Sequence, residues 1–251
     1  HFATNLIPNF NKKKPVMLTQ DIEYRFFSGI YKKIAKIFFY RAVKKSNLII
    51  TNHHLSVYFR RIGCKILGVH EIGISKLCLE NVEKENKERN FDFFLIAKSG
   101  AHKRYFETIE LTNYLSSNGF KVILIDQNRS LKVNLQVKKF QAVSYREILS
   151  HYRNSKVFIS LSKNEGYGLT PLEAFANGCL VASTITPSLR NIKSDRIKIV
   201  SSQFNILEKF KIVAKKLIAN YDIDEKYTYN GFILESWSSK MSKIISVHFN
   251  D

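Results

Sequence analysis

The 251-residue sequence lacks the features that mark membrane-spanning, exported and disulfide-bonded proteins. No apolar run approaches the roughly 20 residues that a membrane-spanning helix needs, and residues 1–11 lack a signal-peptide pattern. The three cysteines, Cys64, Cys78 and Cys179, are odd in number and lack metal-ligand spacing, which excludes a disulfide framework and a zinc site. We therefore expect them to be small core residues of a cytoplasmic protein in a reducing compartment.

Acidic residues are scarce as well, because 21 Asp and Glu stand against 40 Lys and Arg, a net charge of +19. This excess predicts attraction to polyanions such as phosphorylated substrates, anionic lipid headgroups or nucleic acid. No helix-turn-helix, RNP or zinc-finger pattern accompanies the charge, so we do not expect a nucleic-acid partner. A lysine-rich composition explains part of the excess without any ligand.

The second half of the chain has the pattern of an α/β domain. From residue 91 onward, short β-rich segments alternate with helical patterns, which predicts a parallel sheet with helices on both faces. The segments Phe93–Ala97 and Val122–Ile125 are continuously apolar, as expected for strands that are covered on both faces. With 45% hydrophobic residues the chain has ample material for a core. The expected fold class is therefore α/β, with a doubly wound domain in this half.

A polar stretch separates this half from the first. Residues 81–90 hold a single apolar residue and are predicted to form a linker. Residues 1–80 are predicted to form a partial α/β domain, residues 91–234 the doubly wound domain, and residues 235–251 a closing helix. The chain begins without Met and with the pattern of a mid-domain strand, which indicates a fragment.

A glycine-rich segment gives the strongest functional signal. Residues 162–178 read Ser-Lys-Asn-Glu-Gly-Tyr-Gly-Leu-Thr-Pro-Leu-Glu-Ala-Phe-Ala-Asn-Gly, after a predicted strand and into a predicted helix. Ligands of doubly wound folds lie outside the carboxyl ends of the strands, so this turn is the expected ligand site. Thr170 is predicted to cap the helix, with Glu173 three residues later, and Gly178 to end it. The N–H groups at the helix start suit a phosphate or sugar oxygen.

The same segment resembles the Glu-x7-Glu signature of family-four retaining glycosyltransferases, including the Gly-x-Gly-Leu and Pro-Leu-Glu-Ala frame. The resemblance implies a GT-B fold of two Rossmann-like doubly wound domains, of which the N-terminal one is incomplete here. It implies that Glu173 binds the ribose hydroxyls and that Glu165 contacts the donor sugar. The further donor contacts that it implies are Gly166, Tyr167, Gly168, Leu169 and Thr170. The alternative interpretation is that Glu173 is only a capping residue and Glu165 a solvated loop charge.

A basic segment upstream resembles the part of the family that holds the donor pyrophosphate. Family members have Gly-Arg and, five residues beyond the Arg, a Lys; Lys98 and Lys103 keep this spacing, with lysine in place of the arginine. A lysine lacks the bidentate fork of arginine, so the resemblance implies a looser grip on the phosphates. Arg104 is expected to substitute for either lysine. A solvated basic loop is the alternative interpretation.

The resemblance covers nearly the whole chain. Phe140–Val143 is similar to the segment whose backbone lines the nucleobase, so Val143 is an implied donor contact. Trp237 lies in a stretch that resembles the one ahead of a helix crossing back to the first domain. Gln20 and Asp21 resemble the Gln-Asp-x-Glu of the rhamnosyltransferase-like branch and are implied on the acceptor side. Gln20 cannot act as a base and can only hydrogen-bond.

The implied activity is retaining transfer of a sugar from a nucleotide diphosphate sugar to a glycan or lipid-linked acceptor in surface polysaccharide synthesis. The implied catalytic residues are Glu165, Lys98 and Lys103, with the leaving diphosphate helping to deprotonate the acceptor. No cofactor or metal is expected, since no carboxylate pair lies where a metal would bridge the phosphates, and the sequence Asp222-Ile-Asp224 follows a long helix. A catalytically inactive nucleotide-sugar-binding paralogue or scaffold subunit is the alternative function, because the glycine-rich opening loop of the acceptor domain is absent.

A basic amphipathic pattern spans residues 31–45. The residues that it places near one face are Ile30, Ile34, Ile37, Phe38 and Ala42. The favoured interpretation is a helix packed on its own sheet with its lysines in water. The alternative is a helix lying on an anionic bilayer, which would bring the enzyme into peripheral contact with the inner face of the membrane.

Overall fold

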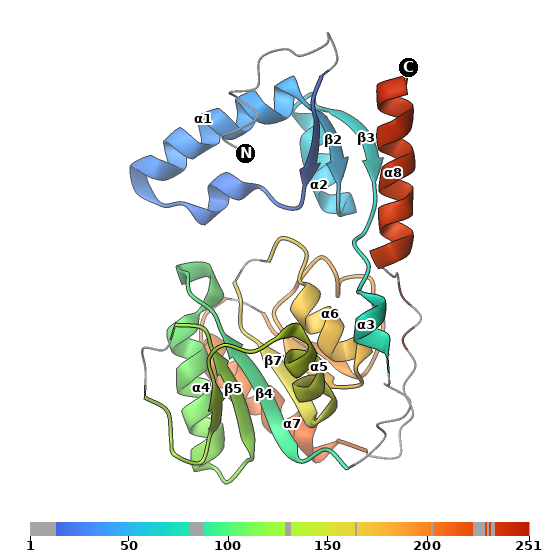
Figure 1. The fold of residues 1–251 in the computed structure, drawn as a ribbon. Coiled ribbons are helices and arrows are strands. Elements are labelled where there is room, and N and C mark those ends of the chain that lie inside the picture. The colour runs from blue at the N-terminus through green and yellow to red at the C-terminus, as the bar shows by residue number, and fades with distance from the viewer. Residues whose placement is uncertain are drawn as a thin grey trace. The chain divides into compact units, whose positions relative to one another are not determined.

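The computed structural model describes residues 14–80, 88–128, 132–163, 165–201, 203–222, 229, 231 and 234–250 (Figure 1). The chain divides into two compact units, one formed by residues 1–75 with 231–251 and the other by residues 76–230. The division falls before the polar stretch, of which residues 81–87 lie outside the described residues. Each unit is described by itself.

The first unit contains a parallel sheet in the order β1-β2-β3. The central strand is buried along its whole length, and its residues Leu48 and Ile50 pack with Phe39, Val43 and Phe59. The elements of this unit are β1 (Val16–Thr19), the 3-10 helix η2 (Glu23–Phe26), α1 (Gly29–Lys45), β2 (Asn47–Ile50), α2 (His53–Arg61), β3 (Lys65–Val69) and α8 (Leu234–Asn250).

Helix α8 spans Leu234–Asn250 and agrees with the predicted closing helix of residues 235–251 to within one residue at each end. Trp237 therefore lies inside the helix, whereas the resemblance implied a Trp ahead of it. The indole Nε1 of Trp237 donates a hydrogen bond to the carbonyl oxygen of His70 at 3.3 Å, and the backbone N–H of Leu234 donates to the carbonyl oxygen of Ile74 at 2.7 Å. These bonds attach the start of α8 to the segment that follows β3.

The second unit is a doubly wound domain around an all-parallel sheet in the order β6-β5-β4-β7-β8-β9. The chain moves outward from β4 through β5 and β6, then crosses to the other side of β4 to form β7, so the strand order reverses between β4 and β7. The elements are α3 (Lys76–Leu79), β4 (Phe91–Ala97), the 3-10 helix η3 (Ala101–Lys103), α4 (Tyr105–Ser117), β5 (Val122–Asp126), β6 (Lys138–Phe140), α5 (Tyr145–Arg153), β7 (Ser155–Ser160), α6 (Leu169–Ala176), β8 (Leu180–Ser183), β9 (Ile197–Ile199) and α7 (Ile206–Ala219).

Helices cover both faces of this sheet (Figure 1). Within β4, Phe93 and Leu95 join the core cluster formed with α4 and α7. Phe94, which points to the other face, contacts Tyr152 of α5 and Phe158 of β7 with ring centroids 5.2 and 5.5 Å apart. Burial on both faces explains why the strand is continuously apolar and confirms the predicted α/β class.

The three cysteines are free and buried, as predicted. Burial raises the pKa of Cys78 to about 12 and that of Cys179 to about 11. Both thiols are therefore protonated and unreactive at neutral pH. Among the described residues, no helix combines the length and the apolar character needed to cross a membrane.

Arg89, near the end of the predicted linker of residues 81–90, is bound to the backbone of the second unit and is not solvated. Its Nη1 donates to the carbonyl oxygens of Tyr152 at 2.8 Å and Ser155 at 2.6 Å, and its Nη2 donates to that of Asn177 at 2.8 Å. Gly178, which ends α6 as predicted, has a φ of +78°, and a Cβ there would lie 2.7 Å from the Arg89 guanidinium. One side chain thus joins the end of α5, the start of β7 and the end of α6.

We expect Arg89→Met to destabilise the second unit by roughly 2–4 kcal/mol, because it leaves three carbonyl oxygens without their charged donor. Arg146→Met, an exposed position on α5, is the matched control and should change stability by less than about 0.5 kcal/mol. Denaturant unfolding of both variants, followed by circular dichroism, measures the difference. Equal midpoints would show that Arg89 is a surface residue.

Candidate functional site

Polar and charged side chains gather where the strand order of the second unit reverses. The chain leaves β4 at Lys98 and leaves β7 through residues 161–168, which lead directly into α6. In open parallel sheets, the carboxyl ends of the strands at such a reversal form the usual ligand site. The predicted lysines and glutamates all belong to these segments or to the first turns that follow them.

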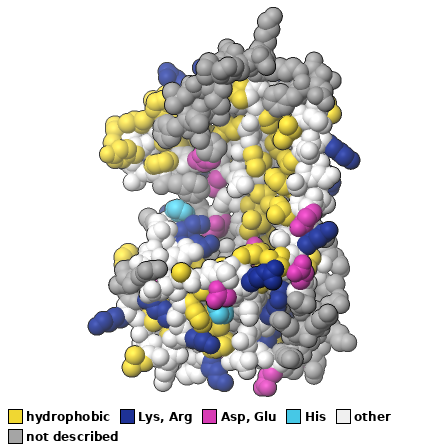
Figure 2. Space-filling view, viewed as in Figure 1, with side chains coloured by type: hydrophobic (Ala, Val, Ile, Leu, Met, Phe, Trp, Pro, Cys, Tyr) yellow, Lys and Arg dark blue, Asp and Glu magenta, His cyan; other side chains and the backbone are white. Residues whose placement is uncertain are grey.

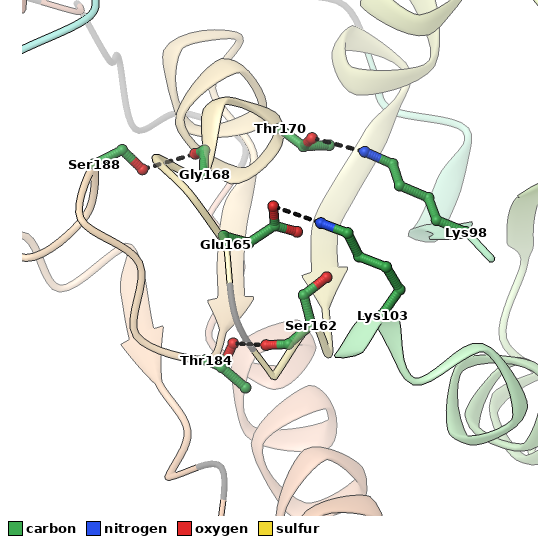
Figure 3. A network of polar contacts seen from close by, with 8 residues as sticks. All are labelled: Lys98, Lys103, Ser162, Glu165, Gly168, Thr170, Thr184 and Ser188. Atoms are coloured by element: carbon green, nitrogen blue, oxygen red, sulfur yellow. Dashed lines mark hydrogen bonds and ion pairs between the residues drawn. The ribbon is translucent and has the colours of Figure 1, made fainter. Parts of the chain in front are cut away.

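A glycine fixes the backbone conformation at the start of α6. Gly168 is the N-cap residue with a φ of +88°, and a Cβ there would lie 2.5 Å from the Cβ of Thr186. The hydroxyl of Ser188 donates to the carbonyl oxygen of Gly168 at 2.7 Å, which fixes this backbone (Figure 3). Only glycine tolerates both the positive φ and the close approach.

The predicted cap at Thr170 is wrong. Helix α6 already begins at Leu169, and no described side chain caps it through a hydrogen bond. The Oγ1 of Thr170 instead accepts a hydrogen bond from the Nζ of Lys98 at 3.2 Å (Figure 3). The N–H groups of the first turn therefore face the site without a capping side chain from the described residues, and Glu173 is not needed to complete a capping box.

Two lysines and two glutamates meet at this helix start. The Nζ of Lys103 lies 2.7 Å from the Oε2 of Glu165, and these side chains are 17% and 15% exposed. Figure 3 shows both Lys98 and Lys103 extending toward the segment from Glu165 to Thr170. The Oε1 of Glu173, one turn into α6, accepts a hydrogen bond from the hydroxyl of Tyr145 at 2.9 Å.

Burial opposes charge at both Lys98 and Glu173. Burial lowers the pKa of Lys98, and the charge of Lys103 lowers it further, against the opposing effect of Glu165 and Glu173. Burial also raises the pKa of Glu173, although the Tyr145 hydrogen bond and the charge of Lys98 oppose the rise. The neighbouring charges and hydrogen bonds therefore do not fully offset the burial of Lys98 and Glu173. An anionic ligand that reached Lys98 would favour its protonated form.

The other predicted donor contacts surround the same turn. Tyr167 is buried, and its carbonyl oxygen accepts from the backbone N–H of Ser188 at 2.9 Å. Gly166 is half-buried and Leu169 is at the surface. Arg104 directs its Nη1 to the carbonyl oxygen of Leu161 at 3.3 Å, so part of its guanidinium binds protein at the end of β7.

The remaining predicted residues belong to other segments of the chain. Val143 is half-buried and precedes Ser144, which begins α5 with a capping box. Gln20 and Asp21 belong to the first unit, where Gln20 is exposed and the Oδ1 of Asp21 accepts from the backbone N–H of Ile22 at 2.6 Å. Of Asp222-Ile-Asp224, only Asp222 is described, and the described residues contain no cluster of three His, Cys, Asp or Glu suited to a metal.

The sequence analysis missed the residues that contact Glu173 and hold it in place. Tyr145 contacts it from another helix, 28 positions away in sequence, so no local spacing could reveal the pair. The Nδ2 of Asn177 donates to the carbonyl oxygen of Glu173 and to the Sγ of Cys78, both at 2.9 Å. The Nε of Arg153 donates to the Oδ1 of Asn177 at 2.9 Å. These contacts hold Glu173 and the end of α6 in place.

Comparison with known proteins identifies relatives of this arrangement. Residues 80–232 match the family described as "Glycosyl transferases group 1". Curated protein sequences give no significant match. Solved structures that are similar to the chain share its GT-B fold, and at their low identities the likeness concerns the fold alone.

Three of these structures illustrate the similarity. Sucrose-phosphate synthase from Thermosynechococcus elongatus is 11% identical with a TM-score of 0.66, covering 99% of this chain and 70% of that one. WaaG, a glycosyltransferase involved in lipopolysaccharide biosynthesis, is 16% identical with a TM-score of 0.62, covering 83% and 67%. The UDP-GlcNAc 2-epimerase of Methanocaldococcus jannaschii is 15% identical with a TM-score of 0.58, covering 90% and 68%.

The lowered pKa of Lys98 predicts how anion binding depends on pH. Because this pKa lies below the ordinary 10.5, the positive charge is lost at a lower pH than on a surface lysine. Pyrophosphate affinity should therefore fall with rising pH in the wild type relative to Lys98→Arg, which stays charged. The ratio of the two affinities, measured by calorimetry from pH 7 upward, cancels the titration of the ligand itself. With rising pH, the affinity of Lys98→Arg relative to that of the wild type should approach the roughly ten- to hundredfold effect of one charge-assisted hydrogen bond. A constant ratio would refute the assigned contact.

Proposed function

Because this chain belongs to the family of group 1 glycosyl transferases, we propose that it transfers a sugar from a nucleotide diphosphate sugar, with retention of anomeric configuration. The observation that supports this most directly is the convergence of Lys98, Lys103, Glu165 and Glu173 at the uncapped start of α6. Cations and helix N–H groups bind phosphates, and carboxylates bind pairs of hydroxyls. A nucleotide diphosphate sugar offers both kinds of group.

We assign the nucleotide to Lys98, Lys103 and Glu173. The two ammonium groups and the N–H groups of α6 hold the diphosphate, since all of them donate hydrogen bonds to oxyanions. The carboxylate of Glu173 accepts the ribose hydroxyls. It has about four lone-pair sites, so the hydrogen bond from Tyr145 leaves capacity for two hydroxyl donors.

We propose that diphosphate binding also releases Glu165. In the structure, Lys103 and Glu165 neutralise one another at 2.7 Å. A diphosphate that bound Lys103 would break this ion pair and leave the Glu165 carboxylate available to the hydroxyls of the donor sugar. Binding of the diphosphate would thus make the Glu165 carboxylate available to bind the donor sugar.

The transfer step then needs no protein nucleophile. The bond between the anomeric carbon and the phosphate oxygen breaks, and the acceptor oxygen forms its bond on the same face of the sugar. The acceptor proton passes to the departing phosphate oxygen. Lys98, Lys103 and the N–H groups of α6 stabilise the charge that develops on this leaving group, which is the main contribution expected from the protein.

We propose a hexose or deoxyhexose as the transferred sugar and a glycan or lipid-linked glycan of surface polysaccharide synthesis as the acceptor. The similarity to the rhamnosyltransferase-like branch around Gln20 and Asp21 supports the first choice, and the fold shared with WaaG supports the second. We propose that donor binding requires no divalent metal, because cationic side chains take the place that a metal would have beside the phosphates.

We expect Lys103→Ala to weaken binding of a nucleoside diphosphate about tenfold, the lower end of a charge-assisted bond, because the wild type must first break its ion pair with Glu165. Lys215→Ala, an exposed lysine on α7, is the control and should change little. The corresponding nucleoside should bind both variants like the wild type. Calorimetry in EDTA measures the affinities of the wild type and the two variants for both ligands. Equal losses in both variants, or binding that requires Mg²⁺, would contradict the proposal.

Substitution of the two glutamates should affect nucleoside diphosphate binding differently. Glu173→Gln should weaken nucleoside diphosphate binding, because a carboxylate that accepts ribose hydroxyls is replaced by an amide. Glu165→Gln should leave this binding unchanged or tighten it, because Lys103 is freed, while the rate of sugar transfer falls. Calorimetry and release of nucleoside diphosphate from the sugar donor measure the two effects. Comparable losses of affinity in both variants would refute the assigned roles.

A further inference from the structure

Helix α1 has apolar residues on two opposite faces. The inner face, with Phe39, Ala42 and Val43, is buried and belongs to the core of the first unit. Five further large side chains, which we call the outer face, are exposed: Ile30 by 63%, Tyr31 by 71%, Ile34 by 45%, Ile37 by 56% and Phe38 by 37%. The favoured interpretation, a helix packed on its own sheet with its lysines in water, is confirmed, but the isoleucines are not part of the packed face.

The outer face forms one continuous stripe. Ile30, Ile34 and Ile37 follow the spacing of one helix face, and Tyr31 and Phe38, seven residues apart, lie beside them. Phe27, just before the helix, adds another half-exposed ring. In Figure 2, hydrophobic side chains gather over the part of the first unit where α1 lies. Single apolar residues are normal on a protein surface, but a contiguous stripe marks an interaction surface.

The charges on α1 are all of one sign. Six of its 17 residues are Lys or Arg, and none is acidic. Arg41 and Lys45 continue the row of Ile30, Ile34 and Ile37 toward the end of the helix, where Lys44 and Lys45 form the last turn. Long basic side chains can lie along an apolar surface while their ammonium groups reach a charged layer beside it.

We propose that the outer face of α1 binds the surface of an anionic lipid bilayer. The isoleucine and aromatic side chains would enter the boundary between headgroups and acyl chains, and the basic residues would lie at the lipid phosphates. Charge complementarity favours this occupant over a second copy of the chain, which would bring six basic residues against six others of the same sign. The proposal does not depend on the glycosyltransferase activity.

Vesicle sedimentation with the 251-residue chain tests the proposal. The chain should bind vesicles of phosphatidylcholine containing phosphatidylglycerol, and binding should weaken in high salt and on pure phosphatidylcholine. Ile37→Glu should weaken binding roughly tenfold, because it replaces an inserted side chain with an anion. Ile212→Glu on α7 is the matched control, since Ile212 is 55% exposed against 56% for Ile37, and it should bind like the wild type.

Substitution of two basic residues at the end of α1 gives an independent test in the same vesicle assay. Lys44→Gln/Lys45→Gln should weaken binding to the anionic vesicles by up to roughly fivefold for each charge removed. Lys215→Gln/Lys216→Gln, two exposed lysines of α7, should have little effect. Nucleoside diphosphate affinity should be unchanged in the α1 variants, so that failure of this surface is distinguishable from failure of the nucleotide site.

Three outcomes would overturn the proposal. Absence of vesicle binding, or equal binding to neutral and anionic vesicles, would remove the lipid surface as the occupant. Equal losses in Ile37→Glu and Ile212→Glu would show that the attraction is diffuse. A wild-type dimer in light scattering that Ile37→Glu dissociates, without vesicle binding, would assign the outer face to a second copy of the chain.

Discussion

The structure of the site depends on the burial of charge at the carboxyl ends of β4 and β7. A parallel sheet covered on both faces leaves these strand ends as the place where polar side chains can meet a ligand. Lys103 compensates Glu165 directly, whereas burial lowers the pKa of Lys98 and raises that of Glu173. A ligand with both oxyanions and hydroxyls would satisfy these groups together, which supports a nucleotide diphosphate sugar.

The rest of the second unit holds α6 in position for that ligand. The start of the helix is fixed through Gly168, which packs against Thr186 and accepts a hydrogen bond from Ser188. Its end is fixed by Arg89, which binds the carbonyl oxygen of Asn177. Because both ends are attached, the N–H groups of the first turn would need little reorganisation in the proposed transfer step. Such preorganised donors are the most effective kind in transfer reactions.

Local patterns predicted most elements of the fold, and long-range contacts account for what was missed. Continuous apolar runs such as Val122–Ile125 and a helix-ending glycine such as Gly178 depend on neighbouring residues, so the sequence predicted them. The Thr170 cap failed because the packing of Gly168 against Thr186 lets the helix begin two residues earlier than the cap requires. The role of Arg89 depends on residues more than 60 positions away, which a polar local sequence cannot reveal.

Helix α1 also shows that a local sequence pattern cannot reveal long-range packing. Periodicity places its isoleucines and Ala42 near one side, but it cannot say which side contacts the sheet when apolar residues occur around most of the helix. Packing resolves this, since Phe39 and Val43 fill the core beside Leu48 and Phe59, and the isoleucines are then left outside. The cost of exposing that stripe would oppose its retention on a protein that met only water. Such a stripe on a basic helix therefore supports the proposal that this surface meets a second, less polar environment.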